Sequence, residues 1–117
     1  MTTHGKYCDF DFYVTSLDTE NGYTATEPMS SGLSLLEAVS EFYKRCGRYP
    51  SSTNIMLGVE YTTSRRDLEP AGKGAAECAK LISDNLPEIT DDPEKVSELI
   101  YRAADEYGIE RCKAVFP

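Results

Sequence analysis

Residues 7–15 read YCDFDFYVT, and this stretch decides the fold because its side chains alternate in character. Cys8, Phe10, Phe12 and Val14 fall on one face, and polar or aromatic residues stand between them. Successive side chains of a β-strand point to opposite faces of a sheet, so this period of two predicts a half-buried strand. One face is expected to enter the core and the other to face solvent.

Turn residues follow this strand and predict a β-hairpin. Residues 18–22 end in Asn-Gly, a pair in which both positions tolerate positive φ, and Tyr23 to Glu27 is expected to return as the second strand. Alternation over Ile55 to Tyr61 predicts a third strand. Gly58 leaves a bare spot on that strand, which suits a bulge or the close approach of another chain.

The first predicted helix begins with a capping box. Ser34 and Glu37 have the spacing at which each side chain bonds the other residue's backbone amide. Apolar residues then recur every three or four positions as far as Cys46, and Gly47 is a natural stop. We therefore expect an amphipathic helix between the second and third strands.

Two more helices and a last strand are predicted in the second half of the chain. A helix is expected at about Ala75 to Asn85, ended by Pro87. Residues 90–94 (Thr-Asp-Asp-Pro-Glu) indicate a helix start, and Gly108 closes the apolar stripe that follows. Alternation over Glu110 to Phe116 predicts the last strand.

The resulting order, β-β-α-β-α-α-β, predicts a single α+β domain over residues 1–117. We expect a two-layer sandwich in which a mostly antiparallel sheet of about four strands is covered on one side by helices. Residues 1–6 are expected to be a flexible tail and residues 63–74 a mobile loop. The expected core consists of Phe10, Phe12, Val39, Phe42, Leu57, Val59, Leu99 and Ile100.

Charge is distributed in three blocks that sum to a net of -8. Residues 1–43 carry -6, residues 44–73 carry +3, and residues 74–117 carry -5. An acidic protein repels nucleic acid and anionic membranes and attracts basic partners, although the same charge also keeps a protein soluble. Without a basic, apolar leader or a run of about 20 apolar residues, the chain is expected to be cytoplasmic and to contact no membrane.

The cysteines offer no metal site in the sequence. Cys8, Cys46, Cys78 and Cys112 lie 38, 32 and 34 residues apart, without the paired spacing of zinc ligands. Each falls on the apolar face of a predicted element, so we expect four reduced, buried thiols. With His4 as the one histidine, a His-dependent catalytic triad is not predicted. Neither a catalytic residue nor a cofactor is expected.

Two acidic groups are candidate partner-binding sites. A run of carboxylates near the third helix could imitate a row of phosphates and occupy the basic groove of a nucleic-acid-binding protein. The same acids also suit a helix start and a solvated face. On the open face of the first strand, acids combine with an aromatic ring. The candidate residues are Asp84, Glu88, Asp91, Asp92, Glu94 and Glu98 in the run, and Asp9, Asp11 and Tyr13 on the strand.

The basic block supports an alternative, an anion site on the loop from Arg65 to Gly74. Arg65, Arg66 and Lys73 could hold an anion before the second helix, but Gly74 stands where a Walker loop needs Ser or Thr. Direct nucleic-acid binding is not expected, because the block carries only +3. We interpret its members, which also include Lys44, Arg45 and Arg48, as ordinary helix-end and loop charges.

Two stretches carry a resemblance to a known group of proteins. These are residues 34–44 (SLLEAVSEFYK) and 56–61 (MLGVEY). In this short acidic chain they resemble small accessory proteins of bacterial phages and conjugative elements, a group that includes antirestriction and anti-CRISPR proteins. The resemblance is one of layout, so it assigns no residue. It implies a non-enzymatic inhibitor of a host defence nuclease, often one that blocks a nucleic-acid channel.

The leading functional hypothesis is therefore an acidic protein-binding module that engages a basic protein, such as a nucleic-acid-binding defence enzyme. One alternative is a small-ligand or anion-binding enzyme that uses the Arg65 to Gly74 loop. Another is a self-associating structural protein built through an open sheet face or edge. Both a monomer and a homodimer are compatible with these hypotheses.

Overall fold

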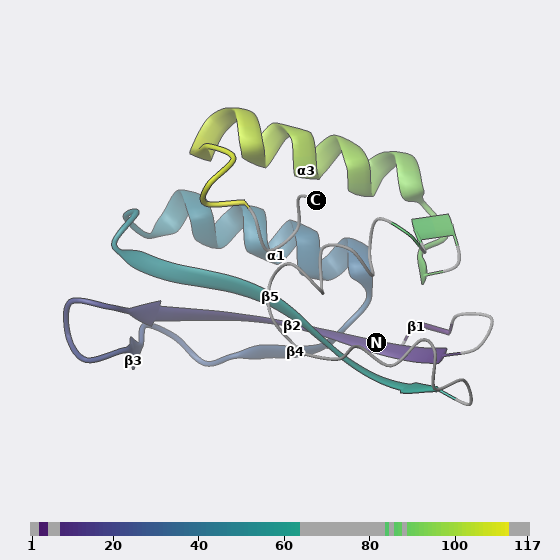
Figure 1. Ribbon diagram of the computed structural model, residues 1–117, viewed down its shortest axis with the longest axis horizontal. Helices are drawn as coiled ribbons and strands as arrows, with labels where there is room; N and C mark the ends of the chain where they lie inside the picture. Colours follow the sequence, from purple (N-terminus) through teal and green to yellow (C-terminus); the bar gives the residue numbers. More distant parts are fainter. Residues whose placement is uncertain (1–2, 5–7, 64–83, 85, 88, 113–117) are drawn as a thin grey trace.

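The computed structural model describes residues 3–4, 8–63, 84, 86–87 and 89–112, with the backbone alone at 3–4, 8–10 and 60–63, and all structural statements refer to these residues. They form an α+β fold, as the sequence predicts (Figure 1). The elements are β1 (Thr3–His4), β2 (Cys8–Asp18), β3 (Thr24–Ala25), β4 (Ser30–Leu33), α1 (Leu35–Arg48), β5 (Thr53–Thr63) and α3 (Pro93–Tyr107).

The sheet is organised around β2, with which every other strand pairs antiparallel. β5 pairs with β2 along its whole length, from Cys8 opposite Thr63 to Asp18 opposite Thr53. Three short strands share the other edge of β2, and their order along it is β1, β4 and β3. The five strands therefore make a sheet that is only three strands wide.

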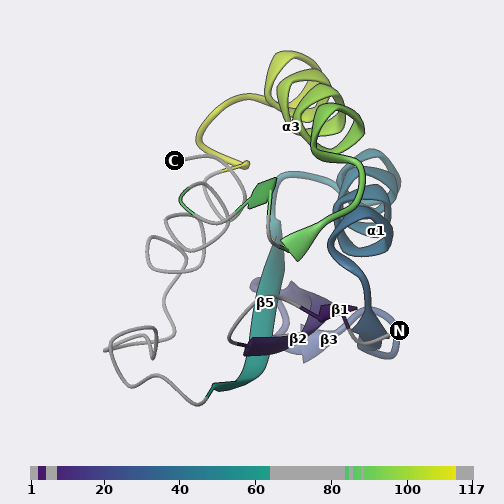
Figure 2. The ribbon, with the colours of Figure 1, turned by 90° about the vertical axis from the view of Figure 1, so that its right-hand side faces the viewer.

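The helices lie on one side of this sheet (Figures 1 and 2). α1 packs on β2 and β5, and α3 packs on α1. The alternation of β2 explains which face they cover, because Phe12, Val14 and Ser16 are buried while the intervening Asp11 and Tyr13 are only half-buried. The predicted covering of one side by helices thus rests on the period of two in β2.

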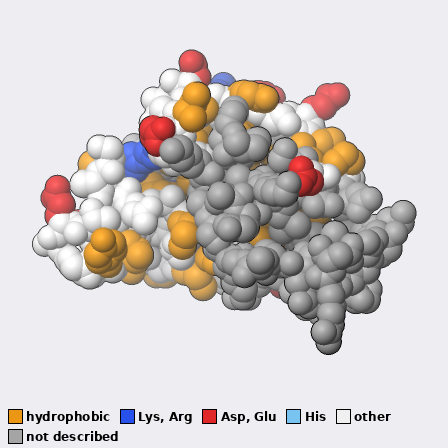
Figure 3. Space-filling model, viewed as in Figure 1, with side chains coloured by type: hydrophobic (Ala, Val, Ile, Leu, Met, Phe, Trp, Pro, Cys, Tyr) orange, Lys and Arg blue, Asp and Glu red, His pale blue; other side chains and the backbone are white. Residues whose placement is uncertain are grey.

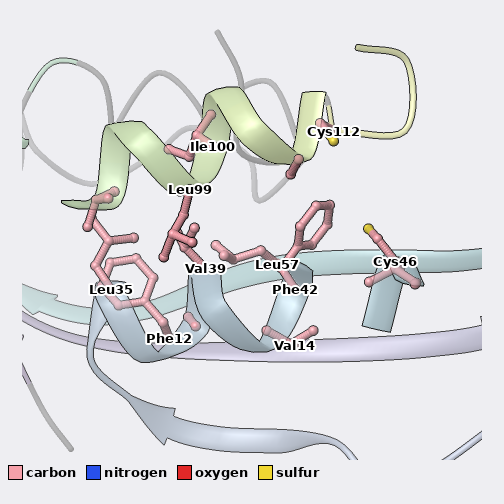
Figure 4. Packing of buried hydrophobic residues seen from close by; sticks show 14 of the residues in the cluster. Phe12, Val14, Leu35, Val39, Phe42, Cys46, Leu57, Leu99, Ile100 and Cys112 are labelled. Carbon is pink, nitrogen blue, oxygen red and sulfur yellow. The ribbon is translucent and has the colours of Figure 1, made fainter. Parts of the chain in front are cut away.

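The core lies between β2, β5 and the two helices (Figure 4). Seven of the eight predicted core residues are buried, and the side chain of the eighth, Phe10, lies outside the described residues. Cys46 and Cys112 are free and buried, as expected, whereas the side chains of Cys8 and Cys78 are not described. The buried positions on α1 and α3 follow the predicted spacing of three and four residues.

The hairpin differs from the prediction in its turn and its length. Positive φ occurs at Gly22 (72°) and Tyr23 (62°) and not at Asn21, so the turn is longer than a two-residue Asn-Gly connection. The returning strand, β3, has only two residues. The chain then forms β4, which the sequence did not predict because Ser-Ser-Gly-Leu lacks both alternation and β-branched residues. The sheet therefore has five strands where about four were expected.

The two ends of the chain also differ from the prediction. Thr3 and His4, expected in a flexible tail, form β1 against Phe10 and Asp9. The predicted last strand is wrong over its described part, because residues 109–112 form a turn in which the Cys112 amide donates to the Ile109 carbonyl at 3.0 Å. Residues 113–117 and 64–74, with the remainder of that strand and most of the expected loop, lie outside the described residues.

The starts of α1 and α3 were predicted correctly, but not every stop. The Ser34–Glu37 capping box is present at α1, and Gly108 (φ 89°) ends α3. α1 continues through Gly47 to Arg48, because the glycine leaves room for α3: a Cβ there would lie 2.6 Å from Tyr107 Oη. Gly47 does not adopt the positive φ with which a glycine commonly ends a helix.

The expected stop at Pro87 is also wrong, because Pro87 and Ile89 are themselves helical. Proline fixes φ at a value that helices share but lacks the amide that an interior position needs, so Pro87 is tolerated close to the end of the helical segment, which stops before Thr90. Residues 75–83 of the expected second helix lie outside the described residues.

A side chain does approach Gly58 closely, but it comes from the neighbouring strand of the same sheet. Its partner across the ladder is Tyr13, whose ring occupies the space where a Cβ of residue 58 would stand. The bare spot predicted from the sequence is thus covered by an aromatic side chain of the neighbouring strand. Tyr13 therefore has a packing role.

We predict that Gly58→Ala destabilises the protein by about 1–3 kcal/mol, because the new methyl group overpacks against the Tyr13 ring. In an open strand position the same change would be neutral or stabilising, since alanine has less backbone entropy to lose. Urea denaturation measures the difference. In the Tyr13→Ala background, Gly58→Ala should cost clearly less. Equal costs in the two backgrounds would contradict the assigned contact.

Candidate functional site

The start of α3 shows which acids of the predicted run are held by the fold. Asp92 is the N-cap, and its Oδ1 accepts a hydrogen bond from the Lys95 amide at 3.0 Å. The Asp92 amide in turn donates to Thr90 Oγ1 at 3.2 Å. These contacts satisfy backbone donors that have no partner within the helix, so Asp92 has a structural task.

The outer face of α3 carries an acidic stripe with an aromatic residue in it. Glu94, Glu98, Tyr101 and Asp105 recur at intervals of four, three and four residues, which places them on one face of the helix. All four are exposed, and Tyr101 is 65% exposed. With a rise of 1.5 Å per residue the stripe is about 17 Å long. We call these four residues, with Asp91 just before the helix, the α3 face.

Acidic side chains project from the molecule where α3 lies (Figure 3). Residues 91–110 contain seven acids and two bases. Glu98 has a long contact of 3.7 Å with Lys95, and exposed pairs of this kind hold a side chain weakly. Asp91, Glu94 and Asp105 have neither a hydrogen bond nor an ion pair in the part of the chain that the structure describes. Their charge is therefore available to a partner.

One acid at the inner edge of α3 is held by α1. Tyr43 Oη donates a short hydrogen bond to Glu106 Oε2. This hydrogen bond, with burial and the charge of Glu106, raises the pKa of Tyr43 to about 12. The ring of Tyr43 also meets Tyr107 edge-on, with centroids 5.4 Å apart. Glu106 therefore joins the two helices and is not part of the α3 face.

The structure separates the two predicted acidic groups. Asp91, Glu94 and Glu98 come together at α3, whereas Asp11 and Tyr13 lie on the sheet face away from the helices. Asp84 is exposed and precedes α3. The side chains of Asp9, Glu88, Arg65, Arg66 and Lys73 lie outside the described residues.

Sequence reasoning missed Tyr101 and Asp105, which extend the α3 face toward its C-terminal end. Their signal was present in the sequence. Continuing the spacing from Glu94 and Glu98 by three and then four residues reaches both of them. A count of acids along the chain stops at Glu98, because it does not consider which face of the helix each residue occupies.

Arg45 is buried, which overturns its interpretation as an ordinary helix-end charge. It is only 1% exposed, and its Nε lies 3.0 Å from Glu41 Oε1 and 3.5 Å from Glu27 Oε1. The guanidinium also donates to Ser16 Oγ of β2 at 2.9 Å. Two further bonds, to the Pro28 carbonyl and Ser30 Oγ, are both 2.9 Å. Arg45 thus ties α1, β2 and the β3–β4 connection together.

Glu27 is the shared acceptor of this cluster. Burial acts to raise its pKa, but the hydrogen bond from Tyr49 and the positive charges of Arg45 and Arg48 outweigh burial and lower the pKa below its usual 4.5. Tyr49 Oη donates to Glu27 Oε1 at 3.0 Å, and Arg48 Nη1 lies 2.5 Å from the same oxygen. The carboxylate is therefore held in its charged form.

The two described thiols are poor nucleophiles. Burial raises the pKa of Cys46 to about 11, against the opposing charge of Arg111, and burial likewise raises the pKa of Cys112. A thiol must lose its proton to attack or to bind a metal, so burial disfavours both reactions at Cys46 and Cys112. Across the described residues, the acidic, His and Cys side chains form no cluster of three that could hold a metal ion.

Comparisons with known proteins assign no family. Neither a protein-family model, nor a curated protein, nor a solved structure matches this chain. Within the described part of the chain, the helices are too short or too polar to cross a bilayer.

We predict that Arg45→Met lowers the free energy of unfolding by about 3 kcal/mol, because it leaves Glu41 without its cation, leaves Glu27 with only the exposed Arg48, and removes the buried donors to β2 and β4. The two carboxylates keep 25% and 24% exposure, which places the cost at the lower end of the range for broken buried pairs. Arg48→Met is the matched control. Arg48 binds the same Glu27 but is 48% exposed, so its loss should cost less than about 1 kcal/mol. Equal losses by urea denaturation would refute the network.

A pH dependence follows from the lowered pKa of Glu27. A carboxyl with a lowered pKa in the folded state stabilises the protein above its unfolded pKa, and this contribution is lost as the pH falls through the folded value. Glu27→Gln should therefore be less stable than the parent at pH 7, and the gap should narrow below pH 4.5. Thermal unfolding across pH 3–7 measures this. A gap independent of pH would contradict the assignment.

Proposed function

We propose that the protein is a non-enzymatic binding module whose α3 face engages a basic surface on a partner protein. The observation that carries this proposal is the combination of uncommitted acids, Asp91, Glu94 and Asp105, with the 65% exposed ring of Tyr101. Charge attracts and orients a basic partner, and an aromatic residue surrounded by polar groups is typical of an energetic anchor. Glu94, Tyr101 and Asp105 lie on α3, and Asp91 lies just before it.

The partner we infer is a protein with a basic groove of the kind that holds nucleic acid. Carboxylates one helical turn apart, as Glu94 and Glu98 are, present a row of negative charge about 6 Å apart along a rod. Such a rod can take the place of a phosphate backbone in a positively charged channel. Inhibition of a host defence enzyme by a mobile element, which the sequence resemblance implies, is the biological setting that this surface suits.

The test compares two charge reversals with the same change in net charge. Glu94→Lys alters the α3 face, and Glu20→Lys alters the exposed hairpin loop. Tagged wild type and both variants serve as bait in bacterial lysate, are washed at rising salt, and the retained proteins are identified by mass spectrometry. The expected partner is basic, is released by moderate salt, and is lost with Glu94→Lys alone.

The affinity for the recovered partner then distinguishes the contribution of the Glu94 charge from that of the Tyr101 packing contact. We predict that Tyr101→Ala weakens binding by roughly 2 kcal/mol at any salt concentration, whereas the effect of Glu94→Lys shrinks as salt increases. Titration calorimetry at 50 and 500 mM salt measures both. Unchanged affinity for both variants would reject the α3 face. A partner whose binding to nucleic acid is unaffected would reject phosphate mimicry while leaving the binding module intact.

A further inference from the structure

A groove with a mixed polar and apolar lining lies away from the α3 face, where the loop leading into β5 meets the turn that follows α3. Both segments lie at the same end of the molecule in Figure 1. The groove encloses about 460 Å³, within the range of small-molecule sites. Its walls come from residues 51–55, from Thr19 of the hairpin loop, and from Tyr107, Glu110 and Arg111.

Arg111 gives this groove a fixed positive charge. Its Nη2 donates to the carbonyls of Tyr49 and Pro50, at 3.2 and 3.1 Å, which holds the guanidinium in one orientation. Its Nε is buried and has no hydrogen-bond partner among the described residues. Among the described carboxylates, none lies within ion-pair distance of Arg111. In a protein of net charge -8, a held guanidinium that bonds two carbonyls and lies beside the Cys46 thiol, with no counterion among the described carboxylates, calls for an anion.

The remaining lining suits a ligand that also carries hydroxyl groups. Ser51, Ser52 and Asn54 offer hydroxyl and amide groups, and Glu110 offers an acceptor for a hydroxyl proton. The side chains of Ile55 and Tyr107 supply an apolar wall. A ring or chain with C–H groups on one side and hydroxyls on the other matches such a mixed lining, and a bare inorganic ion would leave most of the groove unfilled.

We propose that this groove binds a small hydroxylated oxyanion, a sugar phosphate or a sugar acid, whose anionic group pairs with Arg111. The hydroxyl groups of the ligand bond the Ser51, Ser52 and Asn54 side of the groove and Glu110, and its carbon skeleton rests on Ile55 and Tyr107. The site is separate from the α3 face, so the two can be tested independently.

Nuclear magnetic resonance of the arginine Nε–H groups tests the proposal directly. The Nε–H of Arg111 is shielded from solvent and should give a slowly exchanging signal. Glucose 6-phosphate and gluconate are titrated in parallel, with glucose and inorganic phosphate as controls. We expect a saturable shift of the Arg111 signal with at least one of the two anions, at least ten-fold tighter than with either control. The responding anion identifies phosphate or carboxylate as the group bound.

Two variants keep this test independent of folding defects. Ser51→Trp should fill the groove while keeping both backbone carbonyls to which Arg111 donates, and should abolish the saturable shift. Ser31→Trp, at an exposed position of β4, is the matched control and should leave it unchanged. Shifts that are linear in concentration, that glucose alone reproduces, or that survive Ser51→Trp would overturn the proposal, as would no shift at all.

Discussion

The fold depends on one strand having two different edges. β2 offers one edge to β5 along its whole length and divides the other among β1, β4 and β3. Since three separate segments must meet on that second edge, something must hold the connection between them in place. Arg45 does so, because it reaches from α1 to Ser16 of β2 and to Pro28 and Ser30 beside β4. The pairing of the short strands with β2 thus depends on the buried Arg45.

Periodicity made the large elements predictable. Alternation predicted β2 and β5, and apolar stripes predicted α1 and α3. The same patterns predicted which face of each element is buried, including seven core residues. β4 was not predictable in this way, because Ser-Ser-Gly-Leu has no pattern and is held by its neighbours. Gly47 was misread for a related reason: a glycine that lets another helix approach looks, in sequence, the same as one that ends a helix.

The acidic character of the candidate site was predictable from the sequence, but not which residues belong to it. The sequence indicated an acidic surface near Asp91 and Glu94, whereas the fold showed that Asp92 caps the helix and that Tyr101 and Asp105 belong to the same face. Burial of Arg45 and the orientation of Arg111 depend on residues 17 to 62 positions away, such as Pro28 and Tyr49. Such long-range contacts leave no pattern in the neighbouring sequence, so a count of charges does not distinguish a buried arginine from an exposed one.

The pairing of β2 with β5 also sets the order in which the protein can assemble. Between Asp18 and Thr53 there are 35 positions of sequence separation, and between Cys8 and Thr63 there are 55. β2 therefore leaves the ribosome well before its main partner and waits with an unpaired backbone edge and an apolar face exposed, whereas the backbone hydrogen bonds of α1 are local. Because distant pairings pay for closing a long loop before they are stabilised, folding should be slower than for a helical protein of this length. During that delay the unpaired edge and apolar face of β2 are open to aggregation.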